Sequence, residues 1–237
     1  MWRCIQASVD ERRTNEMNRR SHEGSWTGGL GNPRVLRSEL SALVRVVGAL
    51  PWRWFVEDTL GDGDGHAVPV VLVHGLLGDP TNFTSLRRYL ARRGIRRFSS
   101  FAYLPRLDYP RLAGRFAEHL AYVRATTGVV RVDVVAHSLG GLVVRYAMQT
   151  GAVAHVRRLV TLGTPYLACQ NPAQELAVFA ADDALVPPPS DRARRRAVVV
   201  DGCGHLGLLS DVRAFAAVAR HLRRPAPGAE RRLTLAA

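Results

Sequence analysis

The sequence predicts an α/β fold built on a mainly parallel sheet, and two observations carry that prediction. Short apolar runs alternate with stretches of helical periodicity, the order found in parallel sheets that have helices on both faces. Several runs are apolar without interruption, as in "VPVVLVH" at 68–74, and such runs are typical of strands buried on both faces. The chain has 237 residues, 47% of them hydrophobic, which suffices for one domain with a substantial core.

The alternation of strands and helices extends from residue 68 to residue 222. Strands are expected at 68–74, 95–104, 131–136, 156–163, 175–181 and 195–202. Helical periodicity covers 83–93, 112–126 and 139–149, and a last helix is expected at 208–222. Gly94, Gly128 and Gly151 follow the first three helices, where a glycine commonly ends a helix.

The predicted α/β domain occupies residues 67–224, and the flanking segments differ from it in composition. Residues 1–33 are polar and charged, so they are expected to form a disordered leader, and residues 225–237 a disordered tail. Residues 34–66 are expected to form a helix with one apolar stripe, followed by a linker. That linker contains GDGDG at 61–65, whose aspartate spacing does not match a calcium loop.

The charge of the chain does not by itself indicate a nucleic-acid partner. The formal net charge is +13, but every basic residue other than histidine is an arginine, and the arginines are dispersed. The densest group, Arg192 and Arg194 to Arg196, has no aromatic residue between its members. A solvated basic face is therefore the preferred interpretation, and nucleic-acid binding is kept as a minor alternative that predicts a single basic face.

The cysteine content and the lengths of the apolar runs indicate which cofactors and which cellular location to expect. Three cysteines without CxxC spacing indicate neither a disulfide framework nor a zinc site, and nothing in the sequence suggests another metal or an organic cofactor. The first residues lack the apolar core of a signal peptide, and no run is long enough to span a membrane. The expected location is the cytoplasm or the periphery of a membrane, and the sequence does not indicate an oligomeric state.

Ser138 lies between an apolar strand and an apolar helix, which is an unusual place for a hydroxyl group. A nucleophilic serine at such a junction stands on a very sharp turn, and the turn requires small residues two positions before and after it. Ala136 and Gly140 meet that requirement, although glycine is more usual at the first position. The alternative is a serine that only caps the helix. The pattern favours a nucleophile.

A nucleophilic serine needs a base and an acid that orients the base. Of the eight histidines, His205 follows the last strand in a loop that can reach the edge of the sheet, so it is the predicted base. The acid is expected at the end of the preceding strand, where Asp182 and Asp183 both occur. The Asp-x-x-Val-Pro spacing favours Asp183, with Asp182 as the alternative.

The oxyanion of an acyl-transfer reaction needs backbone donors close to the serine. The amide of Leu139, directly after Ser138, is one predicted donor. The second is expected in the loop after the first strand, where Gly75 permits a sharp turn that presents the amide of Leu76.

Taken together, the motifs resemble those of α/β-hydrolase lipases and esterases, with bacterial triacylglycerol lipases most similar. The segments are "VVLVHGLLG", "VDVVAHSLGGLVVRY", "VTLGTP", "DDALVPP" and "GCGHLGLL", in that order. The resemblance covers about Val68 to Leu222. It implies the α/β-hydrolase fold and a hydrolase that cleaves small-molecule or lipid esters with Ser138, Asp183 and His205 as its triad. It also implies the amides of Leu76 and Leu139 as oxyanion donors.

One departure from that family lies after "LGTP", where a helix, cap or lid is usual. Only residues 166–174 connect the two strands here, whereas a parallel crossover usually needs a dozen or more residues. The short link predicts an open pocket, a changed strand order at that edge, or an impaired enzyme. A hydrolase fold that serves as a binding module, and an acyltransferase or thioesterase with the same residues, therefore stay as alternatives.

The segment before the linker suggests a second kind of partner. Its apolar stripe runs from Val35 to Leu50, and Trp52, Trp54 and Phe55 follow, with arginines beside them. Tryptophan and arginine beside an apolar stripe suit a water–lipid boundary, which suggests peripheral membrane contact. The alternative is that the stripe packs against the hydrolase body.

Overall fold

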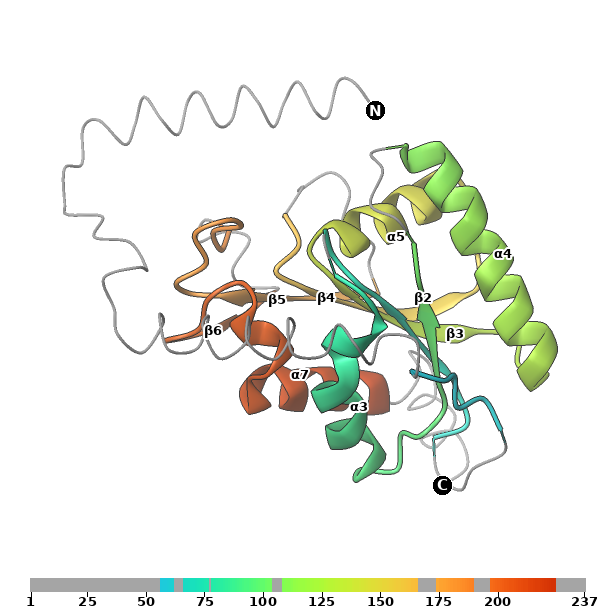
Figure 1. The fold of residues 1–237 in the computed structure, drawn as a ribbon, viewed down its shortest axis with the longest axis horizontal. Coiled ribbons are helices and arrows are strands. Elements are labelled where there is room, and N and C mark those ends of the chain that lie inside the picture. The colour runs from blue at the N-terminus through green and yellow to red at the C-terminus, as the bar shows by residue number, and fades with distance from the viewer. Residues whose placement is uncertain are drawn as a thin grey trace, which may run out of the picture.

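A computed structural model describes residues 56–61, 66–76, 78–103, 108–165, 174–189 and 197–224. The described residues form a six-stranded sheet with the order β2-β1-β3-β4-β5-β6, and every neighbouring pair of strands is parallel (Figure 1). The strands are β1 Val70–Val73, β2 Phe98–Phe101, β3 Val132–His137, β4 Val156–Leu162, β5 Glu175–Ala180 and β6 Ala197–Val200. The predicted parallel α/β sheet is confirmed.

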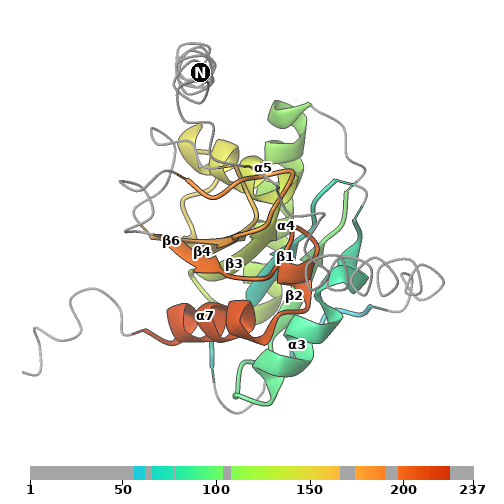
Figure 2. The same cartoon turned by 90° about the vertical axis from the view of Figure 1, so that its left-hand side faces the viewer.

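Helices cover both faces of the sheet, as predicted (Figure 2). The helices α3 Thr84–Ala91 and α7 Val212–Arg223 lie on one face, and α4 Tyr109–Thr127 and α5 Leu139–Gln149 lie on the other. Short 3₁₀ turns lie at Pro80–Phe83 and Gly207–Leu209. The last helix begins at 212 rather than at the predicted 208, because the Asp211 side chain accepts a hydrogen bond from the Arg213 amide and caps the helix there.

Alternation along each strand divides the core into two parts. Val70 and Leu72 of β1 face α3 and α7, whereas Val71 and Val73 face α4 and α5. All six residues of β3 are buried, including Asp133, so this strand is covered on both faces although its sequence is not apolar throughout. Sheet and helices therefore form three layers, and the carboxyl ends of the strands share one edge, where the predicted site residues follow them.

The β5 strand lies beside β4, although the link between them is short. Parallel pairing begins with Leu159 opposite Glu175 and continues to Leu162 opposite Val178. From β3 to β6 the strands follow their order in the sequence. The strand predicted at 175–181 is confirmed, and the changed strand order considered for this edge is wrong, because the link returns the chain directly to the neighbouring position.

The segment before the predicted linker contacts the sheet. Thr59 pairs with Phe98 of β2, and Leu60 is buried in the core. The Asp58 carboxylate accepts hydrogen bonds from the Ser99 hydroxyl and the Ser100 amide. These contacts belong to residues that sequence analysis placed outside the α/β domain. The stripe at 35–50 and the aromatic residues after it lie outside the described residues.

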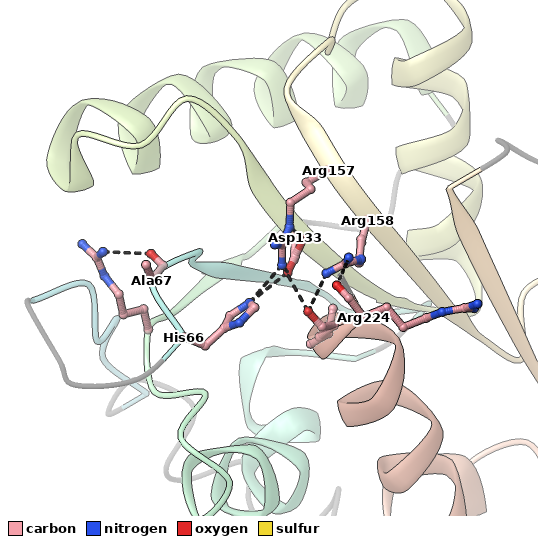
Figure 3. A network of polar contacts seen from close by, with 8 residues as sticks. His66, Ala67, Asp133, Arg157, Arg158 and Arg224 are labelled. Atoms are coloured by element: carbon pink, nitrogen blue, oxygen red, sulfur yellow. Dashed lines mark hydrogen bonds and ion pairs between the residues drawn. The ribbon is translucent and has the colours of Figure 1, made fainter. Parts of the chain in front are cut away.

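A buried carboxylate at the amino end of β3 joins three further parts of the chain (Figure 3). Asp133 is fully buried and accepts hydrogen bonds from Arg157 of β4, and His66 lies 3.2 Å from it. Arg157 and Arg158 also donate to the carbonyl oxygen of Leu222 near the end of α7. A buried charge is tolerated only when it is paired in this way.

In the described ranges, no helix is long and apolar enough to cross a bilayer.

Candidate active site

Ser138 lies at the junction of β3 and α5 in a strained backbone conformation. Its φ is 51° and its ψ is −122°, and among the described residues it is the one non-glycine residue with a positive φ. Such a conformation costs on the order of 1–3 kcal/mol and persists only when its surroundings hold it. The Ser138 amide donates to the carbonyl oxygen of Leu162 at 2.9 Å, and the Ser138 carbonyl oxygen accepts from the Thr164 hydroxyl at 2.9 Å. The chain thus makes the sharp turn that sequence analysis predicted.

Two glycines after the serine let α5 pack close to the sheet. A Cβ atom at Gly140 would collide with the backbone carbonyls of Val73 and His74 at the end of β1. A Cβ atom at Gly141 would collide with the Thr164 side chain. Gly140 was predicted to be small for the sake of the turn, and the structure adds that β1 lies directly against it.

His205 and Asp183 form a buried pair at the same edge of the sheet. The Nδ1 atom of His205 lies 2.7 Å from a carboxylate oxygen of Asp183, and the exposed fractions of the two side chains are 8% and 0%. The other carboxylate oxygen of Asp183 accepts from the amides of Leu185 at 2.9 Å and Val186 at 2.8 Å. These amides hold the carboxylate in place while it faces the imidazole. Asp183, and not Asp182, is the aspartate that contacts His205.

His205 and Ser138 both contact the segment at the end of β4 and just after it. A Cβ atom at Gly163 would lie 3.1 Å from Nδ1 of the His205 ring, so that ring rests on the Gly163 backbone. Ser138 binds Leu162 and Thr164, the two neighbours of Gly163. Within the described part of the chain, hydrogen bonds join the His205 ring to Asp183 but not to the Ser138 hydroxyl. Catalytic hydrogen bonds are often long in a substrate-free site and shorten when substrate binds.

The loop after β1 lies against the serine. A Cβ atom at Gly75 would lie 2.9 Å from the Ser138 Cβ and 2.9 Å from Nδ1 of His137. Only a glycine fits there. Leu76 lies in the turn that follows Gly75 and is 58% exposed. Leu139 is the first residue of α5. Leu139 directly follows Ser138, and Leu76 directly follows the glycine that lies against it, while the donor roles of their amides stay predictions.

His137 is a site residue that sequence analysis did not assign. It is buried, its ring centroid lies 4.8 Å from that of His205, and its Nε2 lies 3.4 Å from the His205 carbonyl oxygen. Burial first, and then the neighbouring His205, lower the pKa of His137 to about 3. His137 is therefore neutral at ordinary pH and supports the loop that carries His205. The adjacency of His137 to Ser138 in the sequence was its only signal.

His74 and Tyr103 form a stacked pair under the loop after β1. Their ring centroids lie 4.4 Å apart, and the Tyr103 hydroxyl donates to the His74 carbonyl oxygen at 2.8 Å. The Tyr103 amide also donates to Nε2 of His74, while Nδ1 lies 2.9 Å from the Gly75 carbonyl oxygen. Burial lowers the pKa of His74, and the Gly75 hydrogen bond and the charge of Asp79 partly oppose that effect. The pair fixes the backbone from which Gly75 and Leu76 project.

A buried ion pair fixes the segment after β4 from the other side. Arg145 of α5 and Glu175 at the start of β5 are each 1% exposed and make two side-chain hydrogen bonds to one another. Arg145 also donates to the Pro165 carbonyl oxygen, and Glu175 accepts from the Thr161 hydroxyl. Pro165 directly follows Thr164, so the ion pair holds the residue that binds the Ser138 carbonyl.

Metal-ligating side chains do not gather near these residues. Across the ranges that the structure describes, no group of three or more histidine, cysteine, aspartate or glutamate side chains could hold a metal ion.

Comparisons with known proteins assign the fold. The profile of the family described as "alpha/beta hydrolase fold" matches residues 111–195, which include Ser138 and Asp183. The solved structure of Est1E from Butyrivibrio proteoclasticus is 13% identical, covers 70% of this chain and 93% of its own, and has a TM-score of 0.53. A thermophilic esterase from Thermogutta terrifontis is 17% identical, covers 70% of this chain and 92% of its own, and has a TM-score of 0.52. Aspergillus fumigatus lipase B is 16% identical, covers 76% of this chain and 57% of its own, and has a TM-score of 0.51.

The protein is thus an α/β-hydrolase-fold protein. The α/β-hydrolase fold predicted from its motifs is confirmed by the family match and by the shared architecture of these solved structures. At such low identity the structural similarity assigns the fold, and the chemistry has to be argued from the site itself.

Proposed function

We propose that the protein hydrolyses carboxylic esters through an acyl-enzyme formed on Ser138. The observation that carries the proposal is the buried hydrogen bond between His205 and Asp183, placed beside a serine in a strained turn. A strained serine, a histidine and a buried carboxylate at one edge of the sheet form the set of groups that acyl transfer requires. The esterases and the lipase with the same fold are consistent with this chemistry.

In the proposed first step, the Ser138 oxygen attacks the acyl carbonyl carbon and the His205 Nε2 atom takes the hydroxyl proton. The carbonyl π electrons move to the oxygen, where the amides of Leu76 and Leu139 stabilise the negative charge. When the oxyanion collapses, the bond to the leaving alcohol breaks and His205 returns the proton to that alcohol. The acyl group then remains on Ser138.

In the proposed second step, water replaces the alcohol. His205 takes a proton from water, the hydroxide attacks the acyl carbon, and collapse of the second oxyanion releases the acid and returns the proton to Ser138. Asp183 stays ionised throughout; it orients the imidazole and stabilises the imidazolium form. Its two amide donors, Leu185 and Val186, keep one oxygen engaged so that the other faces His205.

Hydrolysis of p-nitrophenyl esters with acyl chains of increasing length tests the proposal. The wild-type protein is expected to release p-nitrophenol, and Ser138→Ala is expected to lose activity by about a millionfold while it melts at the same temperature. A fluorophosphonate probe, which labels activated serines, is expected to label the wild-type protein and not Ser138→Ala. Turnover that survives in Ser138→Ala would overturn the assignment of the nucleophile.

The same assay separates the alternatives that use the same fold. If the probe does not label the wild-type protein and no ester is cleaved, the fold serves as a binding module and the proposal fails. If thioesters are cleaved much faster than oxygen esters, or an added alcohol receives the acyl group in preference to water, the acyl-enzyme part stands and the hydrolase part is replaced.

A further inference from the structure

The helices α3 and α7 lie side by side on the face of the sheet opposite α4 and α5 (Figure 2). Residues of these two helices and of the segments that follow them line a groove. Its volume is about 500 Å³, and four arginines line it, namely Arg93, Arg220, Arg223 and Arg224. Ala216 and Ala219 form an apolar wall, and Tyr89 is the remaining lining residue. The two helices pack beside one another through Tyr89 and Phe215, whose ring centroids lie 5.5 Å apart.

The two helices carry no negative charge to balance these arginines. From Thr84 to Arg93 and from Val212 to Arg224 the sequence contains eight arginines and no aspartate or glutamate. Within the described part of the chain, no ion pair engages any of the four groove arginines. Four guanidinium groups around one groove repel one another, and a bound anion would relieve that repulsion.

The groove arginines are not required as caps for the end of α7. The last carbonyl groups of that helix already have donors, because Arg158 binds the carbonyl oxygens of Leu222 and Arg224, and Arg157 binds that of Leu222 (Figure 3). Arg224 takes part in this network through its backbone, which leaves its side chain to line the groove. A purely structural account of the arginines as helix caps is therefore incomplete.

One groove arginine is oriented in advance. The Arg93 guanidinium lies 3.5 Å from the centre of the Tyr89 ring and donates to the Tyr89 carbonyl oxygen at 3.2 Å. Such stacking reduces the rotamer freedom that binding would otherwise remove.

We propose that this groove binds a phosphate group, carried by a small phosphorylated molecule or by a phospholipid headgroup. Guanidinium groups match phosphate oxygens in charge and in the geometry of paired hydrogen bonds, and several of them can share one group. The groove lies near the amino ends of the strands, because Arg93 precedes β2 and the end of α7 contacts Arg158 of β4. Ser138 lies at the carboxyl ends, so the two sites are separate and the proposal does not depend on the proposed esterase activity.

Calorimetric titration of the full-length protein with pyrophosphate, at constant ionic strength, tests the proposal. Wild-type protein is expected to bind pyrophosphate, and Arg93→Ala and Arg223→Ala are each expected to weaken binding about tenfold, as for loss of one charge-assisted contact. Arg88→Ala is the matched control, because Arg88 lies on α3, is exposed and does not line the groove. It removes the same charge and is expected to change the affinity less than twofold.

Vesicle sedimentation separates the two sources of phosphate. Phosphatidic acid vesicles that retain the wild-type protein but not the Arg93→Ala/Arg223→Ala double variant would identify a headgroup. Pyrophosphate binding without vesicle retention would identify a soluble ligand. The proposal is overturned if neither probe binds, or if Arg88→Ala weakens binding as much as the groove variants do. All four variants alter exposed side chains, and their melting temperatures are measured to confirm that each one is folded.

Discussion

Arg145 of α5 and Glu175 of β5 form an ion pair in which each side chain is only 1% exposed, although 30 residues separate them in the sequence. Glu175 is the first residue of β5, and Arg145 also binds the Pro165 carbonyl oxygen. One guanidinium group thus holds both ends of the short β4–β5 link.

Breaking this pair should destabilise the protein strongly. Arg145→Met leaves the Glu175 carboxylate buried without its partner, and removal of one member of a buried pair costs about 3–5 kcal/mol. The double variant Arg145→Met/Glu175→Leu should be less destabilised than Arg145→Met, because no charge is left unpaired. Urea unfolding of wild type, both single variants and the double variant gives the coupling energy. A double variant whose loss equals the sum of the two single losses would contradict the pairing.

The two neighbouring aspartates should differ in their effect on activity. Asp183→Asn removes the charge that faces His205, and in a serine triad that change lowers kcat by about 10⁴-fold. Asp182→Asn is the control with the same chemical change one residue earlier, and it should reduce kcat less than tenfold. Steady-state rates on a p-nitrophenyl ester measure both. The reverse ranking would move the acid to Asp182 and leave the rest of the proposed mechanism in place.

Two glycine-to-alanine variants should have opposite effects on stability. Gly140→Ala puts a methyl group into the backbone of β1, which the core cannot absorb, and should cost about 1–3 kcal/mol or more. Gly114→Ala lies within α4, where a Cβ atom meets nothing within 4 Å, and should stabilise the helix by roughly 0.5–1 kcal/mol. Urea unfolding measures both variants. If Gly140→Ala were neutral, the close approach of α5 to β1 would be wrong.

Local patterns were enough to predict the sheet and the turn at Ser138. Uninterrupted apolar runs mark strands buried between two layers, and β1, from Val70 to Val73, is buried over its whole length. The turn could be predicted because its steric requirement is met by residues adjacent in the sequence, Ala136 and Gly140. The order of strands also favoured Asp183 and His205, since both follow strands whose carboxyl ends share an edge.

Contacts between distant segments could not be predicted in the same way. Arg145 lies in an otherwise apolar helix, and nothing near it in the sequence indicates that Glu175 neutralises it. His66 was interpreted as a linker residue, yet it lies beside Asp133, 67 residues later in the chain. His137 was not assigned a role because its neighbours, Gly75 and His205, come from two other loops. Each of these contacts depends on the packing of the whole sheet.

Replacement of His137 should change how stability depends on pH. Its pKa is near 6.5 in the unfolded chain, and burial lowers it to about 3 in the folded protein. Between these values the unfolded state binds a proton that the folded state does not, so the free energy of unfolding falls as the pH falls below 6.5. From pH 7.5 to pH 5.0 this one residue should remove about 2 kcal/mol of stability.

His137→Gln tests that linkage, because glutamine keeps an N–H group that can face the His205 carbonyl oxygen but does not titrate. Burial also lowers the pKa of His74, His119 and His221, and these residues are unchanged in the variant, so they cancel in the comparison. At pH 7.5 the variant should be less stable than wild type, because its packing against His205 is poorer. At pH 5.0 that difference should shrink or reverse by about 2 kcal/mol, since only the wild type loses the contribution of His137. Urea unfolding of both proteins at the two pH values measures the change, and an identical difference at both would show that His137 does not titrate between them.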